Sequence, residues 1–282
     1  MNSRTKSHFV IVRPLNVLLG MLSIFVGAFL TGTLSPLPNV LLACISGGLI
    51  MAGGNVINDY FDIEIDRVNK PFRPLPAGQL SPRAALNLST ILFALGIFLS
   101  IFIQIFSFAV AAVTVVGLII YSARLKRTFL WGNVAVSVFA GLAFVYGGLA
   151  VRGTKGFWIP AGFAFLFHLG REIIKGVEDR EADGRVQANT LALRVGGPHA
   201  LRVATGVYLF LILLTIAPYV FHIYGEGYIW TVVFGVDLVV LLMLAAIWFD
   251  SSPPMLRRVS AILKADMFIG LIALYQGQAN IS

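Results

Sequence analysis

Long apolar stretches separated by short polar segments dominate this chain. No Lys, Arg, Asp or Glu occurs in 14–58 or in 84–123. A membrane-spanning helix needs roughly 20 apolar residues, so each stretch is long enough for two spans. Each also contains a break with turn-forming residues, at 34–38 and at 104–107. Across the whole chain the pattern predicts nine spans, at 14–32, 39–60, 84–103, 106–123, 131–150, 157–175, 200–221, 228–249 and 263–281.

The composition supports a membrane protein and limits its partners. Of the 282 residues, 58% are hydrophobic and 12% are charged, whereas a soluble domain carries about 25% charged residues. In a chain this apolar, the net charge of +8 indicates basic cytoplasmic loops and no nucleic-acid partner. We therefore expect an all-α, multi-pass protein of the cell membrane, with residues 1–282 forming one domain.

The basic residues predict the orientation of the spans. If the N-terminus is cytoplasmic, all 21 Lys and Arg residues except Arg152 and Lys155 fall in cytoplasmic segments. The N-terminal segment, with Arg4, Lys6 and Arg13 ahead of an apolar run, resembles a signal peptide. The run is too long for one and no convincing cleavage site follows, so we interpret it as a retained first span. Nine spans and this charge bias together predict a cytoplasmic N-terminus and an external C-terminus.

An acidic cluster directly follows the second predicted span. Asn58, Asp62 and Asp66 recur every four residues, so they share one face if the helix continues through them. Carboxylates four residues apart on a helix repel each other, so a cation is expected between them. Oxygen ligands without Cys or paired His favour Mg²⁺, which commonly shares its coordination with substrate phosphates. The alternative is a solvated helix end with internally neutralised charges, such as Asp66 with Lys70.

A second cluster occupies the corresponding position after the sixth predicted span. Asp179 and Asp183 lie four residues apart, and Arg171 and Lys175 precede them with the same spacing. A chain of salt bridges four residues apart would also explain this stripe. Both clusters fall at predicted cytoplasmic ends of spans, where two metal-binding carboxylate groups facing each other would clamp a diphosphate. Mg²⁺ would neutralise some phosphate oxygens, and Arg and Lys would bind the others.

Other polar side chains near the clusters are candidates for binding the diphosphate. Tyr121 and Lys126 end the fourth predicted span, where anchoring of a basic cytoplasmic loop is the alternative. Arg73 lies in the Pro-rich segment 70–78, which could fold over the site as a lid. Asp237 falls in the middle of a span, where a functional carboxylate and a hydrogen-bonded structural one remain equal alternatives. The substrate-binding candidates are Asp59, Arg67, Lys70, Arg73, Tyr121, Lys126, Arg171 and Lys175.

The two acidic motifs resemble those of the UbiA family of membrane prenyltransferases. That family has N-x-x-x-D-x-x-x-D after its second helix and D-x-x-x-D after its sixth, in a bundle of nine helices. The matching residues are Asn58, Asp62, Asp66, Asp179 and Asp183. The resemblance covers essentially the whole chain through helix count, loop placement and both motifs. It implies that these five residues are the catalytic metal ligands, with Mg²⁺ as cofactor and a prenyl diphosphate as substrate.

Within the family, segment 58–78 is most similar to the branch that acts on geranylgeranylglyceryl phosphate. This similarity implies transfer of a geranylgeranyl group from its diphosphate to the free hydroxyl of that lipid, which forms its second ether bond. The chain departs from the branch at Gly176, Ala182 and Ala192, where Asp, Gly and Pro respectively are usual. These departures leave both carboxylates of the second motif in place.

Two other functions are compatible with the sequence. The first is the same chemistry on another acceptor, either an aromatic quinone precursor or a tetrapyrrole. The second is a cation transporter that uses the acidic clusters as its ion path. A transporter is expected to place carboxylates near the bilayer midplane. Here nine of the 13 acidic residues lie in the two clusters, and we expect only Asp237 to be central in a span.

Overall fold

The computed structural model describes residues 8–185 and 187–279, and every regular element in that part of the chain is helical. The long helices are α2 (Pro14–Phe29), α3 (Leu37–Phe61), α5 (Pro82–Ile101), α6 (Ile105–Ala123), α7 (Trp131–Ala150), α8 (Trp158–Glu178), α11 (Gly197–Val220) and α14 (Pro253–Ala279). One further long helix consists of three continuous parts: α12 (Glu226–Thr231), the π-helical η2 (Val232–Asp237) and α13 (Leu238–Phe249). The short helices are α4 (Ile63–Asn69), η1 (Leu125–Arg127), α9 (Arg180–Arg185) and α10 (Leu191–Val195).

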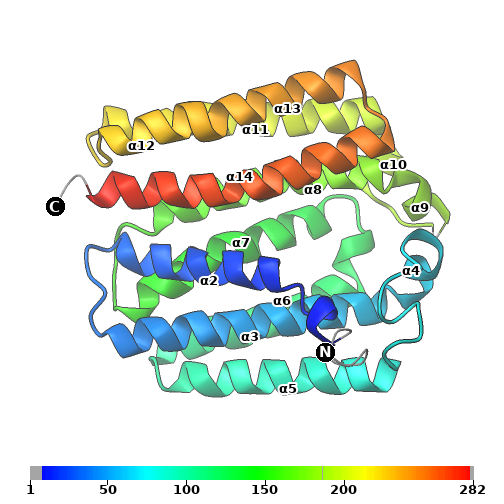
Figure 1. The fold of residues 1–282 in the computed structure, drawn as a ribbon, viewed down its shortest axis with the longest axis horizontal. Helices are drawn as coiled ribbons and strands as arrows, with labels where there is room; N and C mark the ends of the chain where they lie inside the picture. Colours follow the sequence, from blue (N-terminus) through cyan, green and yellow to red (C-terminus); the bar gives the residue numbers. More distant parts are fainter. Residues whose placement is uncertain (1–7, 186, 280–282) are drawn as a thin grey trace.

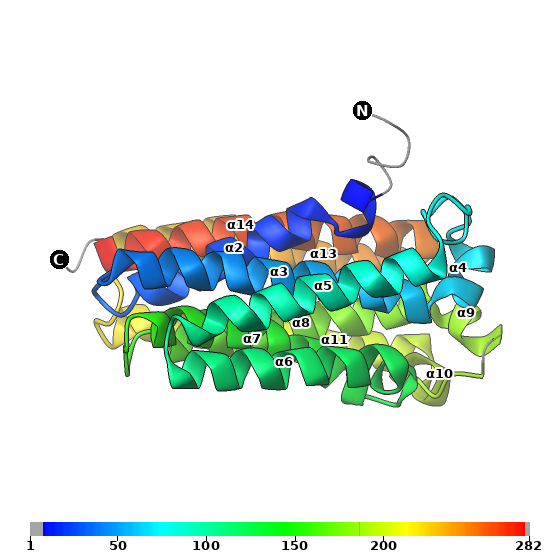
Figure 2. The ribbon, with the colours of Figure 1, turned by 90° about the horizontal axis from the view of Figure 1, so that it is seen from below.

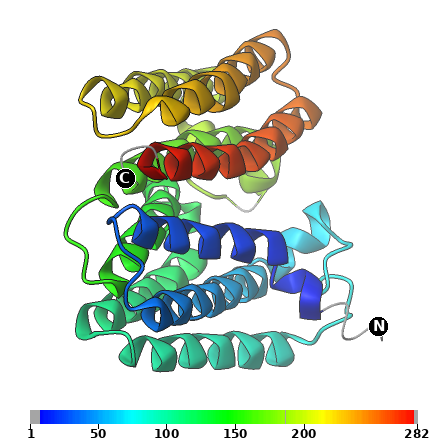
Figure 3. The same cartoon turned by 60° about the vertical axis from the view of Figure 1, so that its left-hand side comes forward.

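The long helices lie side by side along one axis, as Figures 1 and 2 show. The short helices α4, α9 and α10 gather at the same end of the bundle in both views. Figure 3 shows the N-terminal helices on one side and the C-terminal helices on the other, and α14 packs against α2 between them. The two acidic clusters, which lie at α3–α4 and α8–α9, therefore meet at one end of the bundle.

The predicted spans correspond closely to the observed helices. Seven helical spans in the described residues are long and apolar enough to cross a membrane, so the chain is a multi-pass membrane protein. The spans predicted at 14–32 and 157–175 correspond to α2 and α8. The first has only 16 residues, and the C-terminal half of the second carries Arg171, Glu172 and Lys175.

One predicted boundary was wrong. The last span was expected at 263–281, but α14 begins at Pro253, and residues 280–281 lie outside the described ranges. The basic residues Arg257 and Arg258 gave segment 253–262 the composition of a loop. The buried side chains Leu256 and Val259 of this segment, with Leu263 after it, instead follow helical spacing and pack into the core.

Because α14 begins earlier than predicted, a second carboxyl group lies in the middle of a helix inside the bundle. Asp266 lies in the middle of α14 and is 2% exposed, so the expectation that Asp237 alone is central was wrong. Asp237 accepts a hydrogen bond of 2.9 Å from the Thr215 hydroxyl, as its structural interpretation requires. Neither carboxyl oxygen of Asp266 has a hydrogen-bond partner among the described residues.

Two glycines allow the backbones of α2 and α7 to touch. A Cβ atom on Gly147 would lie 1.8 Å from the carbonyl oxygen of Ile24, and one on Gly27 would lie 2.3 Å from that of Phe144. Small residues allow close helix packing in membranes, where apolar lipid removes the hydrophobic drive between helices. This contact fixes α2 against α7, so it also places the start of α2 near the end of the bundle that carries the acidic clusters.

Gly147→Ala is expected to destabilise the protein by about 1–3 kcal/mol, because the added methyl group forces α2 and α7 apart. Thermal unfolding of the purified protein in detergent measures this effect. The matched control is Gly206→Ala in α11, where a Cβ atom would meet nothing within 4 Å. An equal melting temperature for the two variants would contradict the close packing described above.

Candidate active site

A cavity with a volume of ≈ 870 Å³ lies inside the bundle. Its mouth is charged and includes residues of both acidic clusters, whereas Met51, Phe139, Phe167 and Leu271 are among the apolar residues lining its interior. A cavity with one charged end and an apolar interior suits a ligand with an anionic head and a hydrocarbon tail. The shape and chemistry of the cavity therefore match an amphiphile.

Most of the predicted site residues line this cavity. Those that do so are Asn58, Asp62, Asp66, Lys70, Arg73, Tyr121, Lys126, Arg171, Lys175, Asp179 and Asp183. Asp59 and Arg67 do not. Both acidic clusters thus face one space, as the sequence predicted.

The first cluster retains its four-residue spacing across a break in the helix. Helix α3 ends at Phe61, but the Asp62 amide still donates to the Asn58 carbonyl at 3.1 Å, and the Asp66 amide donates to the Asp62 carbonyl at 2.8 Å. Because these bonds keep helical spacing, the three side chains stay on one face. The carboxyl groups of Asp62 and Asp66 are both buried, with exposures of 3%.

Cations compensate the buried carboxylates of this cluster. Asp62 Oδ2 accepts from the Lys126 ammonium and, at 3.3 Å, from the Asn58 amide. Asp66 Oδ2 accepts from Arg73 Nη1 at 2.5 Å. The other oxygen of Asp62, Oδ1, is buried and has no hydrogen-bond partner among the described residues. Burial raises the pKa of Asp66, while the Arg73 guanidinium opposes this shift.

The second cluster does not form the chain of salt bridges that was the alternative to a ligand site. Arg171 Nη1 and Lys175 Nζ both pair with Glu172, at 3.0 Å and 3.4 Å. Asp179 follows α8 and Asp183 lies in α9, joined by a 2.9 Å bond from the Asp183 amide to the Asp179 carbonyl. Within the described residues neither carboxylate takes part in an ion pair.

Lysines connect the two clusters electrostatically. The pKa of Asp183 is raised to about 6, because burial and repulsion from Asp179 and Asp62 outweigh the lowering effects of Lys126 and of the Thr190 hydroxyl. Burial also lowers the pKa of Lys70, and attraction to Asp179 opposes that shift. The mutual influence of Asp62 and Asp183 means that the clusters share the cavity mouth.

Asp59 and Arg67, which were expected to bind substrate, lie outside the cavity lining for different reasons. Asp59 is 4% exposed and accepts from the guanidinium groups of Arg13 and Arg73, the latter at 3.2 Å. It therefore orients Arg73, which does line the cavity. The Arg67 side chain is exposed and pairs with Glu64 at 2.9 Å, away from the cavity.

The oxygen ligands fit a metal ion that is shared with a bound phosphate. In the described part of the chain no three His, Cys, Asp or Glu side chains lie close enough to hold a metal ion by themselves. Mg²⁺ is usually held by one or two carboxylates, with water and substrate phosphates completing its shell. The unpartnered Oδ1 of Asp62 and the unpaired carboxylates of Asp179 and Asp183 offer such ligands.

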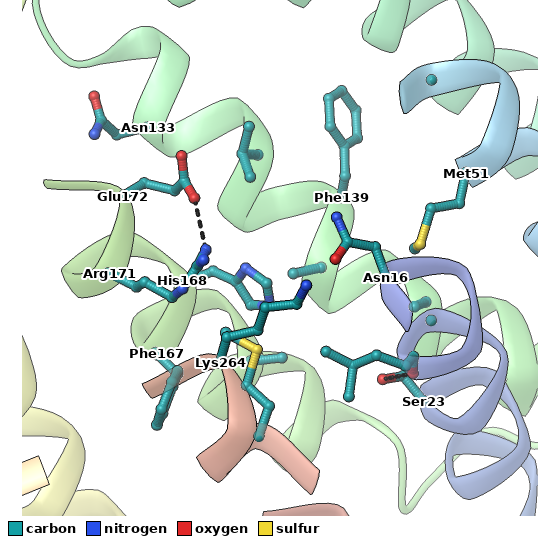
Figure 4. A pocket seen from close by; sticks show the side chains of 18 of the residues that line it. Asn16, Ser23, Met51, Asn133, Phe139, Phe167, His168, Arg171, Glu172 and Lys264 are labelled. Atoms are coloured by element: carbon teal, nitrogen blue, oxygen red, sulfur yellow. Dashed lines mark hydrogen bonds and ion pairs between the residues drawn. The ribbon is translucent and has the colours of Figure 1, made fainter. Parts of the chain in front are cut away.

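The cavity also contains polar residues that the sequence did not assign to the site. Figure 4 shows several of them, and they come from α2, α7, α8 and α14. Arg13 and Lys264 had been taken as part of the cytoplasmic charge. No motif or regular spacing in the sequence connects these residues to the clusters. Among these added lining residues are Arg13, Asn16, Asn133, His168, Lys264 and Asp266. Glu172, which belongs to the second cluster, lines the cavity as well.

Fold and site together define a multi-pass helical membrane protein in which two aspartate clusters face one amphiphilic cavity. Residues 20–272 match the model of the UbiA prenyltransferase family, and the chain belongs to that family. It is 35% identical over 269 residues to the digeranylgeranylglyceryl phosphate synthase of Methanopyrus kandleri, covering 95% of this chain and 97% of that protein.

Solved structures show the same fold. A structure described as that of a digeranylgeranylglyceryl phosphate synthase in membranes matches with a TM-score of 0.75 and 30% identity, covering 98% of this chain and 99% of that one. A UbiA homologue from Archaeoglobus fulgidus, bound to DMAPP and Mg²⁺, matches with a TM-score of 0.72 and 22% identity, covering 94% and 99%.

Arg73→Ala is expected to weaken binding of a prenyl diphosphate by roughly 10-fold or more, because it removes a charged donor at the cavity mouth. Arg67→Ala, the matched control, should change affinity by no more than about twofold, because its exposed ion pair contributes little. Calorimetric titration in detergent with Mg²⁺ present measures both affinities. Equal losses in the two variants would place Arg67 in the site after all.

Proposed function

We propose that this chain transfers a geranylgeranyl group from its diphosphate to geranylgeranylglyceryl phosphate, which forms an ether lipid. The observation that carries this proposal is that both aspartate clusters line one cavity with a charged mouth and an apolar interior. The relatives described above, with which the chain shares about a third of its residues over nearly its full length, support the choice of donor and acceptor.

The donor diphosphate is proposed to bind at the charged mouth. Lys70 and Arg73, from segment 70–78, and Lys126, from η1, offer N–H donors to phosphate oxygens. Lys175 and Tyr121 offer further donors from α8 and α6. The geranylgeranyl chain extends into the apolar interior, so its burial adds a hydrophobic contribution to binding.

The metal-binding residues are proposed to be Asn58, Asp62, Asp66, Asp179 and Asp183. Two observations support Mg²⁺: the set of oxygen donors in the cavity mouth, and the Mg²⁺ found with DMAPP in the A. fulgidus homologue. Mg²⁺ bound there would neutralise charge that develops on the diphosphate as it leaves.

The chemistry requires a good leaving group and a dry cavity. The bond between C1 of the isoprenoid and its phosphate oxygen breaks, and the electron pair remains with the diphosphate. Lys126 and Arg73 stabilise that charge in the low-dielectric mouth. The acceptor hydroxyl oxygen then forms a bond to the allylic cation, and its proton passes to the released diphosphate. Apolar walls that include Phe139 and Phe167 exclude water, which would otherwise capture the cation.

The same proposal includes the topology. We propose nine spans in one domain over residues 1–282, with a cytoplasmic N-terminus and the cavity mouth at the cytoplasmic face. Helix α2 is shorter than the other spans, and α8 is long enough but carries more charged residues. Both lie among the other helices and line the cavity. The basic segments 67–83 and 124–127 flank the same end of the bundle as both acidic clusters, which fits the cytoplasmic excess of Lys and Arg. Arg4 and Lys6, which belong to the same argument, lie outside the described residues.

Purified protein supplied with geranylgeranyl diphosphate, geranylgeranylglyceryl phosphate and Mg²⁺ is expected to form the diether product, detected by mass spectrometry. Asp62→Asn should lower turnover by roughly 100-fold or more, because Asp62 positions Lys126 and Asn58 in the mouth. Chelation of Mg²⁺ should also stop the reaction.

The matched control is Glu181→Gln, whose exposed carboxylate pairs with Arg185 outside the cavity and whose loss should leave turnover unchanged. Formation of product only with an aromatic or tetrapyrrole acceptor would refute the proposed acceptor. Full activity of Asp62→Asn would refute the proposed role of the first cluster.

A further inference from the structure

Lys264 is a cation of the cavity wall without an anionic partner. It lines the cavity from α14, and among the described residues it forms no salt bridge. The neighbouring cations Arg171, Arg13 and Lys175 repel it. Glu172 pairs with Arg171 and Lys175, and Asp59 pairs with Arg13, so Lys264 is the cation of this group that no described carboxylate compensates. A partly buried cation is unfavourable unless an anion compensates it. The arrangement therefore favours a bound anion beside Lys264.

Arg171 is held rigidly next to this position. Its Nη1 pairs with Glu172 at 3.0 Å, and its Nε donates to the carbonyl oxygen of Ser260 at 3.1 Å. Ser260 precedes Lys264 by one helical turn on α14, so the second bond fixes Arg171 to the helix that carries Lys264. These bonds engage Nε and Nη1, and within the part of the chain that the structure describes no hydrogen bond engages Nη2 of Arg171, which lines the cavity. A lysine and an anchored arginine from two helices thus converge on one part of the wall.

Two neutral polar side chains complete this part of the wall. Figure 4 shows Lys264 reaching from α14 into the cavity, with Asn16 of α2 and His168 of α8 pointing into the same region. Asn16 Oδ1 and His168 Nδ1 are buried and have no hydrogen-bond partner among the described residues. Buried polar atoms are normally hydrogen-bonded, so unpartnered ones that face a cavity indicate a polar ligand. Because Oδ1 of Asn16 can only accept, the groups that can donate to a phosphate oxygen are the Asn16 amide Nδ2 and a ring N–H of His168.

This group of residues is distinct from the cations that pair with the first aspartate cluster. Lys126 and Arg73 bind Asp62 and Asp66, whereas Lys264 lies on α14 and forms no such pair. The proposed acceptor carries a phosphate monoester near the hydroxyl that reacts. An enzyme that joins it to a prenyl diphosphate needs a second anion site within the same cavity, with one anion-binding group for each headgroup.

We propose that Lys264 and Arg171, with Asn16 and His168, bind the phosphate monoester of the acceptor. This inference rests on the proposed function and deepens it by assigning residues to recognition of the acceptor headgroup. Lys264 is a specificity-determining residue in this account, because it distinguishes phosphorylated from unphosphorylated acceptors and does not act on the donor.

The test compares two acceptors in steady-state kinetics: geranylgeranylglyceryl phosphate, and geranylgeranylglycerol, which lacks the phosphate. Lys264→Met should lower kcat/KM for the phosphorylated acceptor by roughly 10- to 100-fold, the effect of losing a charged hydrogen bond. It should leave kcat/KM for the unphosphorylated acceptor and the KM for geranylgeranyl diphosphate within about twofold of wild type, since neither involves the lost contact. Lys264→Arg should restore most of the loss.

Two controls keep the test decisive. Arg258→Met removes an exposed cation from the same helix and should change none of these constants. Glycerol phosphate, used as an inhibitor competing with the phosphorylated acceptor, should bind more weakly to Lys264→Met than to wild type. This inhibition remains measurable even if turnover of the unphosphorylated acceptor is slow.

An equal loss of kcat/KM with both acceptors, or a raised KM for the diphosphate donor, would overturn the assignment while the proposed function stands. Unchanged inhibition by glycerol phosphate in Lys264→Met would overturn it as well. A wild-type protein that does not use the phosphorylated acceptor at all would refute the proposed function and this inference with it.

Discussion

Compensation of buried charge at one end of an apolar bundle is the constraint on which this structure depends. A carboxylate removed from water is unfavourable by several kcal/mol unless a cation or hydrogen-bond donors compensate it. Asp62 and Asp66 are almost fully buried, and Lys126 and Arg73 are their partners. The same two cations are proposed to bind the leaving diphosphate, so the ion pairs also keep them directed into the cavity mouth.

The bundle places these charges through a few specific backbone arrangements. The helical hydrogen bonds that continue past the end of α3 keep the first cluster on one face. Asp59 joins Arg13, near the start of α2, to Arg73 on the loop after α4. Direct contact between α2 and α7 at Gly147 fixes the helix that carries Asn16. The charged mouth and the apolar interior are therefore parts of one packed unit.

The sequence predicted the helices and the two aspartate clusters because both follow from local periodicity. A spacing of four residues specifies one helix face, and a break as slight as that at Asp62 does not disturb it. The same spacing explains why one predicted substrate-binding residue lies outside the cavity lining. Asp59 is adjacent to Asn58 in sequence, but one residue turns the side chain by about 100° around the helix, out of the cavity. Lys264 was missed because it was counted only with the cytoplasmic excess of basic residues, at the start of the last predicted span. The Arg13–Asp59 pair joins residues 46 apart, which no local pattern reveals. The transporter hypothesis does not survive, since the chain belongs to a prenyltransferase family.

We propose that the two clusters bind one diphosphate jointly, and a double-mutant cycle measures whether they do. The measurement is the Mg²⁺-dependent affinity for a non-hydrolysable thiodiphosphate analogue of the donor in wild type, Asp62→Asn, Asp179→Asn and the double variant. If the clusters share the ligand, each single change should remove most of the Mg²⁺-dependent affinity, and the second should add little. Independent, additive losses would contradict the account, because they would mean that the clusters bind separate ligands.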